Sequence, residues 1–576
     1  MTPSLPIGID DFRLLREQGL VYVDKTQMVC ELIDDPGAQV LLLPRPRRFG
    51  KSLNLSMLRC WFERSDEKLD HLFEGLHVWD AGAPYRAHFQ RYPVVYLNFK
   101  DLKPERADDF RGDVRELIRD LYQQHREVLD RGGLDGVDAE RYRAILAGSA
   151  TASLYRRALK DLSAALHRYH GERVVILIDE YDAPVHAAYL GGFADEVLGF
   201  FRAFLSGGLK SNPHLHRAVL TGILRIARES IFSGLNNLAV CSLLEPAYAT
   251  AFGFTECDVR DLLVRLGRVD DLQVIQDWYN GYVFGGQVIY NPWSVLSFLR
   301  SSGPPKPYWL TTSSNDLIKH VLGVHATRLQ PLLEGLLAGD GIDTVVDENI
   351  VLDDLDYDER ALWSLLLFSG YLKAELRGTT QDGQGRYRLA IPNREVRRVY
   401  ADSFQRWMSE RMRGHGADLN ALVQAVLSGD AETFERHLQA FAKNLLSYHD
   451  TGTVGPENLY QGFLIGLCAV MEPEHLVRSN RESGSGRPDV MIRPRQPGSP
   501  GVVMELKVAG RGADALDAAL AAGLDQLAGK DYAAELRASG ADPVHAFAVA
   551  FDGKEVRVRR AAPGPTRSGV GTIGAQ

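Results

Sequence analysis

The segment LLLPRPRRFGKSLNLSML, residues 41–58, constrains the fold more than any other stretch of the sequence. An apolar run ends at a proline, a basic turn follows, and Gly50, Lys51 and Ser52 open a stretch with apolar residues at helical spacing. This order predicts a strand, a phosphate-binding loop and a helix, because backbone N–H groups at a helix start hold phosphates. The standard loop reads G-x-x-x-x-G-K-[ST], and Arg45 occupies the position of its first glycine.

In a loop of this kind the lysine and the hydroxyl have separate roles. Lys51 reaches the β and γ phosphates of ATP, and the Ser52 hydroxyl is a ligand of Mg²⁺. The basic turn adds positive charge where the phosphates lie. We therefore expect the whole run to contact the nucleotide: Arg47, Arg48, Phe49, Gly50, Lys51, Ser52 and Leu53. The alternative is a basic turn that only caps a helix, and this segment alone does not exclude it.

Two further strands end in polar residues that complete such a site. In ERVVILIDEYDAP, Asp179 follows five apolar residues and is expected to hold Mg²⁺ through water, while Glu180 polarises the attacking water. The strand in HRAVLTGIL ends near Thr221, which can sense the γ-phosphate from between the other two strands. Arg225 and Arg228 are candidates for stabilising transition-state charge, although a solvated helix face explains either one equally well.

Overall charge and cysteine usage bound the function. The net charge of -9 gives no general attraction to nucleic acid, so any such contact needs a local basic patch. The five cysteines have no C-x-x-C spacing, which argues against a zinc site or a disulfide framework and fits a reducing cytosol. The sequence begins without a signal peptide and has no apolar run of about 18 residues, the length that a membrane span needs. We expect a cytoplasmic protein without a membrane partner.

The C-terminal part carries a second set of acidic and basic residues on predicted strands. Asp489 precedes the apolar run in GRPDVMIRP, and Glu505 and Lys507 alternate with apolar residues in GVVMELKVAG. Because side chains alternate along a strand, Glu505 and Lys507 share one face. A hairpin through the Pro- and Gly-rich residues 495–501 brings Asp489 beside that face. Two converging carboxylates bind Mg²⁺, and Lys507 orients or helps to deprotonate water, which is an arrangement that cleaves phosphodiesters.

Two predicted helices add candidates to this second site. Glu457, at the start of the helix in PENLYQGFLIGLCAV, is a candidate metal ligand or orienting carboxylate. Gln526 and Tyr532, in LDQLAGKDYA, lie within reach of the metal centre or of the strand to be cut. The alternative is a fold that has kept these residues and only binds its ligand.

Together these motifs resemble known families. GIDDFRLLREQGLVYVDKT, PRPRRFGKSL, VVILIDEYDAP and TGILRIARESIFSGLNNL are similar to the bacterial and archaeal AAA-ATPase-like family, whose loop also carries arginines before F-G-K-S. WYNGYVFGGQVIYNPWSVL, YWLTTSSND and IPNREV extend this resemblance over most of the chain. The C-terminal set resembles the PD-(D/E)xK nuclease superfamily, with Gln526 and Tyr532 similar to the glutamine and tyrosine feature of its RecB-like branch. The resemblance implies an ATP-binding fold joined to a nuclease fold.

The expected fold class is α/β, with four parts along the chain. Residues 1–250 form an AAA-like P-loop domain, and residues 251–430 form a helical and winged-helix-like region. Residues 431–561 form a restriction-endonuclease-like α/β domain, and residues 562–576, rich in Gly, Pro, Ser and Thr, form a disordered tail.

Three functions of different classes remain open. The first is an ATP-dependent, Mg²⁺-dependent nuclease acting on nucleic acid, with DNA preferred, in defence against foreign DNA. The second is an ATP-dependent switch or scaffold whose nuclease-like domain binds nucleic acid without cutting it. The third is an ATPase acting on protein partners, with a structural C-terminal domain. Asp489, Glu505 and Lys507 together favour the first, because a scaffold has no use for that lysine. The sequence leaves the oligomeric state open, and a homo-oligomer is compatible with it.

Overall fold

A computed structural model gives the structure of most of the chain. It describes residues 4–131, 134–224, 237–301, 303–309, 332, 335–337, 339–349, 354–355, 358–401, 418–445, 456–468, 471, 474–479, 488–510, 513–530 and 532–562. Residues 563–576 of the predicted tail therefore lie outside the described residues. The chain divides into two units, the first comprising Met1–Val324 and Asp343–Val396 and the second His325–Ile342 and Arg397–Gln576.

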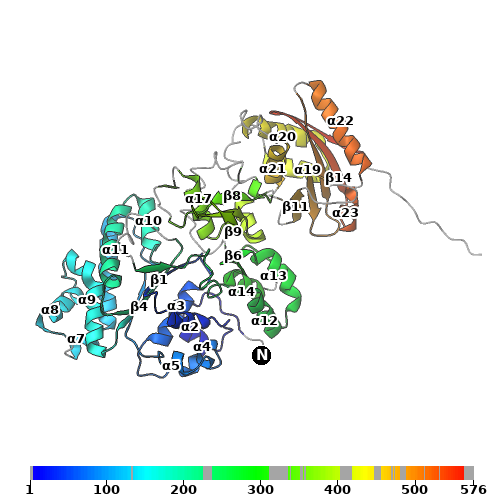
Figure 1. Ribbon diagram of the computed structural model, residues 1–576. Coiled ribbons are helices and arrows are strands. Elements are labelled where there is room, and N and C mark those ends of the chain that lie inside the picture. Colours follow the sequence, from blue (N-terminus) through cyan, green and yellow to red (C-terminus); the bar gives the residue numbers. More distant parts are fainter. Residues whose placement is uncertain are drawn as a thin grey trace, which may run out of the picture. The chain divides into compact units, whose positions relative to one another are not determined.

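The first unit is built on a parallel sheet with the strand order β2-β3-β4-β1-β5 (Figure 1). Its strands are β1 (Val40–Pro44), β2 (Val94–Asn98), β3 (Val174–Asp179), β4 (Leu215–Gly222) and β5 (Leu238–Val240). Every residue of β1 and β3 is buried, which is why both strands read as continuous apolar runs. In this order β4 lies between β1 and β3, as the sequence predicts, so the carboxyl ends of these strands meet at one edge.

Helices cover this sheet and extend beyond it. They are α1 (Phe12–Glu17), α2 (Gln27–Asp34), α3 (Lys51–Phe62), α4 (His77–Asp80), α5 (Ala83–Arg86), α6 (Ala107–Gln124), α7 (Glu127–Asp130), α8 (Gly136–Leu146), α9 (Ala152–His170), α10 (Ala183–Gly191) and α11 (Ala194–Leu209). Helix α9 is capped at its start by Thr151, whose side chain accepts a hydrogen bond from the Leu154 N–H, and at its end by Gly171, which has a left-handed backbone. Helices α9 and α11 pack closely, because Gly208 lies where any side chain would clash with Leu159 (Figure 1).

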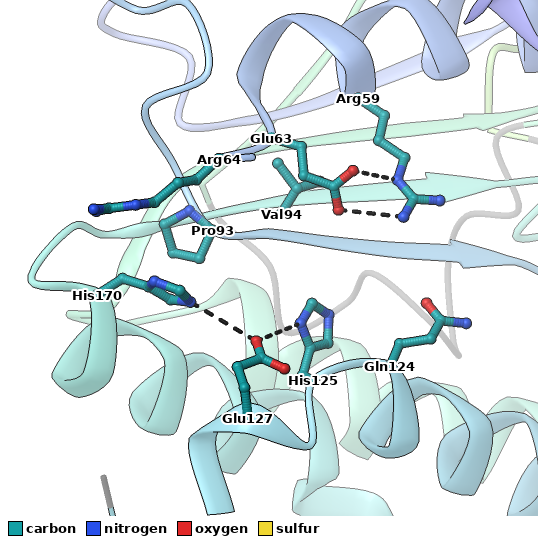
Figure 2. Close-up of a pocket in the computed structure, with 9 residues that line it drawn as sticks. All are labelled: Arg59, Glu63, Arg64, Pro93, Val94, Gln124, His125, Glu127 and His170. Carbon is teal, nitrogen blue, oxygen red and sulfur yellow. Dashed lines mark hydrogen bonds and ion pairs between the residues drawn. The ribbon is translucent and has the colours of Figure 1, made fainter. Parts of the chain in front are cut away.

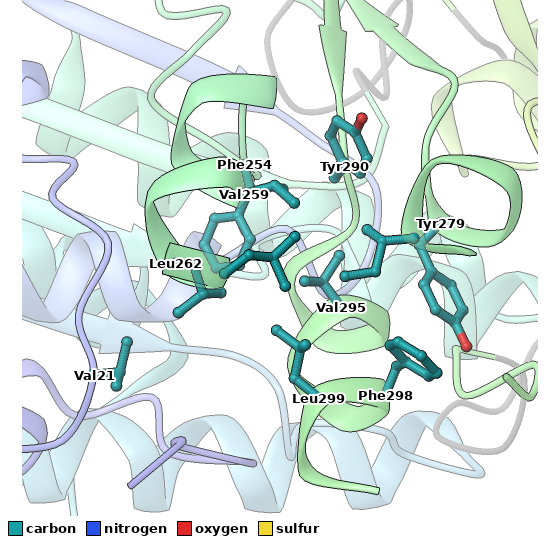
Figure 3. Close-up of a cluster of buried hydrophobic side chains, with 11 residues drawn as sticks. Val21, Phe254, Val259, Leu262, Tyr279, Tyr290, Val295, Phe298 and Leu299 are labelled. Carbon is teal, nitrogen blue, oxygen red and sulfur yellow. The ribbon is translucent and has the colours of Figure 1, made fainter. Parts of the chain in front are cut away.

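A second apolar core lies among the helices that follow the sheet. Helices α12 (Glu256–Leu266), α13 (Leu272–Tyr279) and α14 (Pro292–Arg300) surround it, and a hairpin of β6 (Tyr282–Phe284) and β7 (Gln287–Ile289) joins two of them. Figure 3 shows the side chains that meet there, with Val21 of the N-terminal segment among them. The same segment is held by Lys25, whose ammonium lies 2.6 Å from the Asp258 carboxylate at the start of α12.

The winged-helix-like stretch follows in the first unit. Helix α17 (Glu359–Phe368) precedes the antiparallel strands β9 (Lys373–Thr379) and β10 (Gly385–Ala390), and β8 (Ile342–Val345) adds a third strand in the order β8-β10-β9. The order of a helix followed by a strand, a turn and a strand is that of a winged-helix-like module. All residues of α17 from Ala361 to Phe368 are buried, so this helix is a core element.

The second unit contains a mixed sheet with the order β11-β12-β13-β14-β15. Its strands are β11 (His475–Ser479), β12 (Val490–Pro494), β13 (Gly501–Val508), β14 (Val544–Asp552) and β15 (Glu555–Arg560), and its helices are α19 (Leu419–Ser428), α20 (Ala431–Leu445), α21 (Pro456–Cys468), α22 (Ala513–Gly529) and α23 (Ala533–Ala538). Strands β12 and β13 pair antiparallel, which confirms the hairpin predicted through residues 495–501. Strands β13 and β14 pair in parallel, with α22 and α23 between them in sequence.

Two half-buried histidines make the first unit sensitive to acid. Burial, with a smaller effect of neighbouring cations, lowers the pKa of His125 and of His216 to about 4. The unfolded chain binds these protons near pH 6.5, so the free energy of unfolding falls as the pH drops from about 6.5 towards 4. We expect the melting temperature to fall over this range. His216→Phe should flatten the fall, because a phenyl ring keeps the stacking on Tyr92 (centroids 4.3 Å apart) without titrating. His71→Phe, at an exposed position, is the matched control. An equal slope in the His216 variant and the parent would contradict this account.

Candidate active sites

The turn between β1 and α3 has the geometry of a phosphate-binding loop. Gly50 caps α3 with a left-handed backbone (φ 88°), and Arg48 is also left-handed (φ 69°). Lys51 is only 5% exposed, and its ammonium donates to the carbonyl oxygens of Arg45 and Pro46, each at 3.2 Å. Burial lowers the pKa of Lys51, and the Glu180 and Asp179 carboxylates partly oppose this effect. The ammonium therefore lies inside the loop, where phosphate oxygens can replace the two carbonyls.

A fully buried carboxylate lies beside this lysine. Asp179, at the end of β3, accepts hydrogen bonds from the Ser52 hydroxyl at 2.6 Å and the Thr221 hydroxyl at 2.6 Å. The Asn98 amide donates to the same carboxylate at 3.3 Å. The structure thus brings Ser52, Asp179 and Thr221 together as predicted, and it adds Asn98. A polar residue closing the apolar run VVYLN was the available signal for Asn98, because the same pattern marks the ends of β3 and β4.

The residues after Asp179 are held in an unusual conformation. Glu180 has a left-handed backbone (φ 48°) and is half-buried near Lys51. Asp182, 1% exposed, accepts hydrogen bonds from the N–H groups of Ile223 at 2.8 Å and Leu224 at 3.0 Å. These bonds tie the end of β4 to the turn after β3, so they fix the position of Thr221 relative to Asp179.

Arg45, the residue in place of the first glycine, faces away from the phosphate site. Its side chain is fully buried and donates to the carbonyl oxygens of Pro44 (2.8 Å), Cys241 (2.8 Å) and Tyr248 (3.2 Å). The guanidinium also lies over the Phe252 ring, 5.2 Å from its centroid. Burial lowers the pKa of Arg45 to about 10. Arg45 therefore fastens residues 241–252, here called the collar, to the end of β1.

The other residues of the predicted nucleotide contact lie in different surroundings. The Phe49 ring is in the core, 4.9 Å from the Tyr282 ring, so only its backbone can face a nucleotide. Arg48 is exposed and lies over Trp293, whereas Arg47 and Leu53 are half-buried. Arg225 and Arg228 lie outside the described residues.

In the second unit the strand register brings the predicted carboxylates together. Val490 pairs with Met504, which places Asp489 next to Glu505, and the Asp489 carboxylate accepts a hydrogen bond from the Leu506 N–H at 2.7 Å. Glu505 is 2% exposed, and one of its oxygens, Oε1, accepts a hydrogen bond from the Lys507 ammonium at 2.8 Å. Burial raises the pKa of Glu505; Lys507 opposes this shift and Asp489 adds to it.

These residues fit a divalent cation. The second oxygen of Glu505, Oε2, is buried and has no hydrogen-bond partner in the described part of the chain. Such an oxygen costs free energy unless it gains a partner, and oxygen ligands from paired carboxylates suit Mg²⁺. The described residues contain no cluster of three or more metal-ligating side chains. Glu457 lies on α21, but its side chain is outside the described residues.

Comparison with known proteins agrees with this geometry. Residues 6–232 match the family model of predicted AAA-ATPases (AAA-ATPase_like), and residues 455–561 match that of the PD-(D/E)XK nuclease superfamily (PDDEXK_9). The chain joins an AAA-ATPase-like domain to a PD-(D/E)XK nuclease superfamily domain. It is 29% identical over 562 residues to the "Uncharacterized protein in vnfD 5'region" of Azotobacter chroococcum mcd 1, over 95% of this chain and 96% of that protein.

A solved structure is also similar over part of the chain. The Aeropyrum pernix ORC2 protein, in its ADPNP–ADP complexes, aligns over 66% of this chain and 92% of its own, with 10% identity and a TM-score of 0.21. A TM-score this low does not establish a shared overall fold. No helix in the described ranges is both long and apolar enough to cross a membrane.

Two contacts support the carboxylates of the PD-(D/E)XK domain. Gln526 and Tyr532 were predicted within reach of the metal centre; the Gln526 amide donates to the Tyr532 hydroxyl at 3.1 Å, and Tyr532 packs on Val503, which shares a strand face with Glu505. Gln461 on α21 donates to the Asp489 carbonyl at 2.5 Å and was not predicted. Its position one helical turn after Glu457 was the only signal for it in the sequence.

A cavity of about 390 Å³ in the AAA-ATPase-like domain lies away from the phosphate loop (Figure 2). It is lined by the start of β2 and the ends of α3, α6 and α9, so it lies at the amino edge of the parallel strands. Glu63 is paired with Arg59 at 2.9 Å, and Glu127 lies between His125 and His170, 3.9 and 4.0 Å from their ring nitrogens. None of the predicted site residues lines this cavity.

The different surroundings of Arg45 and Arg47 in the loop lead to a test. Arg45→Leu leaves buried carbonyls without donors and should lower the free energy of unfolding by about 3 kcal/mol. Arg47→Leu, at a half-buried position in the same loop, should lower it by less than about 1 kcal/mol. Denaturant unfolding of both variants and the parent measures the difference. Equal stability in the two variants would show that Arg45 does not hold the collar.

Proposed function

We propose that the AAA-ATPase-like domain binds and hydrolyses ATP with Mg²⁺, and that the nuclease domain cleaves phosphodiester bonds of nucleic acid under control of the nucleotide state. One observation supports this most strongly. In the first unit the Ser52 and Thr221 hydroxyls donate to the Asp179 carboxylate, and in the second Lys507 donates to Glu505, which lies opposite Asp489 in the strand register. A structural domain would gain nothing from burying Glu505, whose Oε2 atom has no hydrogen-bond partner in the described residues.

In the ATPase site each residue has a distinct task. Lys51 binds the β and γ phosphate oxygens in place of the two loop carbonyls it now contacts. Ser52 and Asp179 are the residues that would hold Mg²⁺, which neutralises phosphate charge when bound. Glu180, half-buried near Lys51, orients and polarises the water that attacks the γ-phosphorus. Thr221, held by Asp179 and placed by Asp182, lies where it can contact the γ-phosphate.

In the nuclease site Asp489 and Glu505 are the residues that would hold Mg²⁺, which stabilises charge on the phosphate when bound. Lys507 lies beside Glu505 on the same strand face, so it can orient the attacking water and stabilise the charge that develops on the phosphate oxygens. Water attacks phosphorus, the bond from phosphorus to the sugar oxygen breaks, and the sugar oxygen takes up a proton. Gln461 and the Gln526–Tyr532 pair position these groups.

The proposed substrate is DNA, and the proposed setting is the cytoplasm. An unregulated nuclease there would damage the cell's own nucleic acid, and for this reason we expect the ATPase to control it. Foreign DNA is the proposed target. All five cysteines are free, which is compatible with a reducing compartment. P-loop domains change conformation between nucleotide states, which supplies the means of control.

The ATP site is tested by two substitutions with different outcomes. Lys51→Ala should abolish ATP binding, because the ammonium that reaches the phosphates is lost. Glu180→Gln should bind ATP with nearly parental affinity and lose hydrolysis, because the amide no longer polarises water. Calorimetric titration and phosphate release measure both properties, with Lys100→Ala at an exposed position as the control. Unchanged ATP affinity in the Lys51 variant would refute the nucleotide site.

The nuclease site and its control are tested separately. Glu505→Gln should remove cleavage and leave ATP hydrolysis nearly intact, and its melting temperature should not fall, because burial already disfavours the Glu505 charge. Glu555→Ala, at an exposed acidic residue of the same unit, should cleave normally. Lys51→Ala should suppress cleavage although every nuclease residue remains. If the Lys51 variant cuts as fast as the parent, the two sites are independent.

A further inference from the structure

Residues far apart in the sequence meet behind the phosphate loop. The Trp309 indole N–H donates to the Arg47 carbonyl at 3.3 Å, and the Trp309 side chain is only 1% exposed. This hydrogen bond reaches the loop between Arg45 and the left-handed Arg48, on the backbone rather than on a side chain. Trp309 therefore contacts the backbone of the loop and not the side chains that are proposed to bind phosphate.

Trp309 is itself held by a buried carboxylate. The Glu395 carboxylate accepts hydrogen bonds from the Trp309 backbone N–H at 2.7 Å and the Ser294 hydroxyl at 2.8 Å. Glu395 is fully buried, and burial raises its pKa to about 7, while the hydrogen bonds from Trp309 and Ser294 partly oppose this shift. Ser294 lies in the first turn of α14, so Glu395 joins α14, the Trp309 segment and the stretch after β10.

Packing gives this contact little room to move. The Tyr371 ring lies 5.0 Å from the Trp309 ring, between centroids. A side chain on the neighbouring Gly370, which has φ +87°, would meet Pro46 of the loop at 3.0 Å. The turn after α17 and the Trp309 indole thus contact adjacent residues of the same loop.

We propose that Glu395 and Trp309 are positioning residues that order the phosphate-binding loop before ATP arrives. The inference rests on the ATP binding proposed above. Ordering a loop that contains left-handed residues costs free energy. If the loop is already ordered in the free protein, less of this free energy is lost when ATP binds. Glu395 and Trp309, here called the brace, act on the loop before ATP binds. Loss of the brace should therefore weaken ATP binding and leave the turnover of bound ATP almost unchanged.

Trp309→Phe isolates the hydrogen bond to the loop. Phenylalanine keeps an aromatic ring against Tyr371 and removes the N–H that Arg47 accepts. The dissociation constant for ATP should rise about three- to tenfold, the effect of one hydrogen bond, while kcat at saturating ATP changes less than twofold. Trp278→Phe, at a half-buried tryptophan of the middle helices without a described contact to the loop, should leave both values unchanged.

Substitutions of Glu395 supply a second, independent readout. Glu395→Gln keeps an acceptor for the Trp309 N–H and should bind ATP within twofold of the parent, whereas Glu395→Leu has no acceptor and should show the weaker binding of Trp309→Phe. Unchanged ATP affinity in Trp309→Phe would overturn the positioning role of the brace and leave the proposed function standing. An equal loss of ATP affinity in Glu395→Gln and Glu395→Leu would do the same. A parent chain that binds no ATP would overturn both.

Discussion

A buried guanidinium without an ion-pair partner in the described residues fixes the geometry of the first unit. Arg45 gives its N–H groups to three carbonyls and lies against the Phe252 ring, which binds the collar to the end of β1. The collar in turn contacts α3, because Asn54 donates to the Ala251 carbonyl at 2.8 Å, and Gly253, the residue after the collar, donates to the Phe49 carbonyl of the phosphate loop at 3.0 Å. Glycine at position 45 could make none of these side-chain contacts. Arginine in place of the first glycine of the standard loop therefore serves to hold the collar.

Both sites have the same arrangement. The strands bury their apolar residues, and the polar side chains lie where the pairing with a neighbouring strand ends. In the first unit Asn98, Asp179 and Thr221 close three neighbouring parallel strands, so one edge collects a carboxylate and its donors. In the second unit Glu505 lies within a strand, and its neighbour Asp489 precedes the adjacent one. In the second unit the Oε2 atom of Glu505 is buried without a hydrogen-bond partner in the described residues, and this unfavourable burial is the physical argument for a cation there.

The sequence predicted the parts of the fold that depend on local pattern. The apolar runs of β1, β3 and β4, the start of α3 at Lys51 and the hairpin before Glu505 all follow from periodicity and turn residues. The contact of Ser52 with Asp179 was predictable because parallel strands end at one edge. The roles of Arg45, Gln461 and Glu395 were not, since each depends on a partner far away in the sequence. The Phe49 ring lies in the core for the same reason: Tyr282 supplies the surface that buries it.

The central claim is that one chain contains an ATP site that controls a metal-dependent nuclease. The most direct measurement incubates the unaltered chain with circular and linear DNA and Mg²⁺, in the presence of ATP, ADP or no nucleotide, with parallel samples lacking Mg²⁺. The account predicts cleavage that requires Mg²⁺ and differs between ATP and ADP. Cleavage at the same rate in every nucleotide state would contradict the control, and no cleavage under any of these conditions would contradict the nuclease.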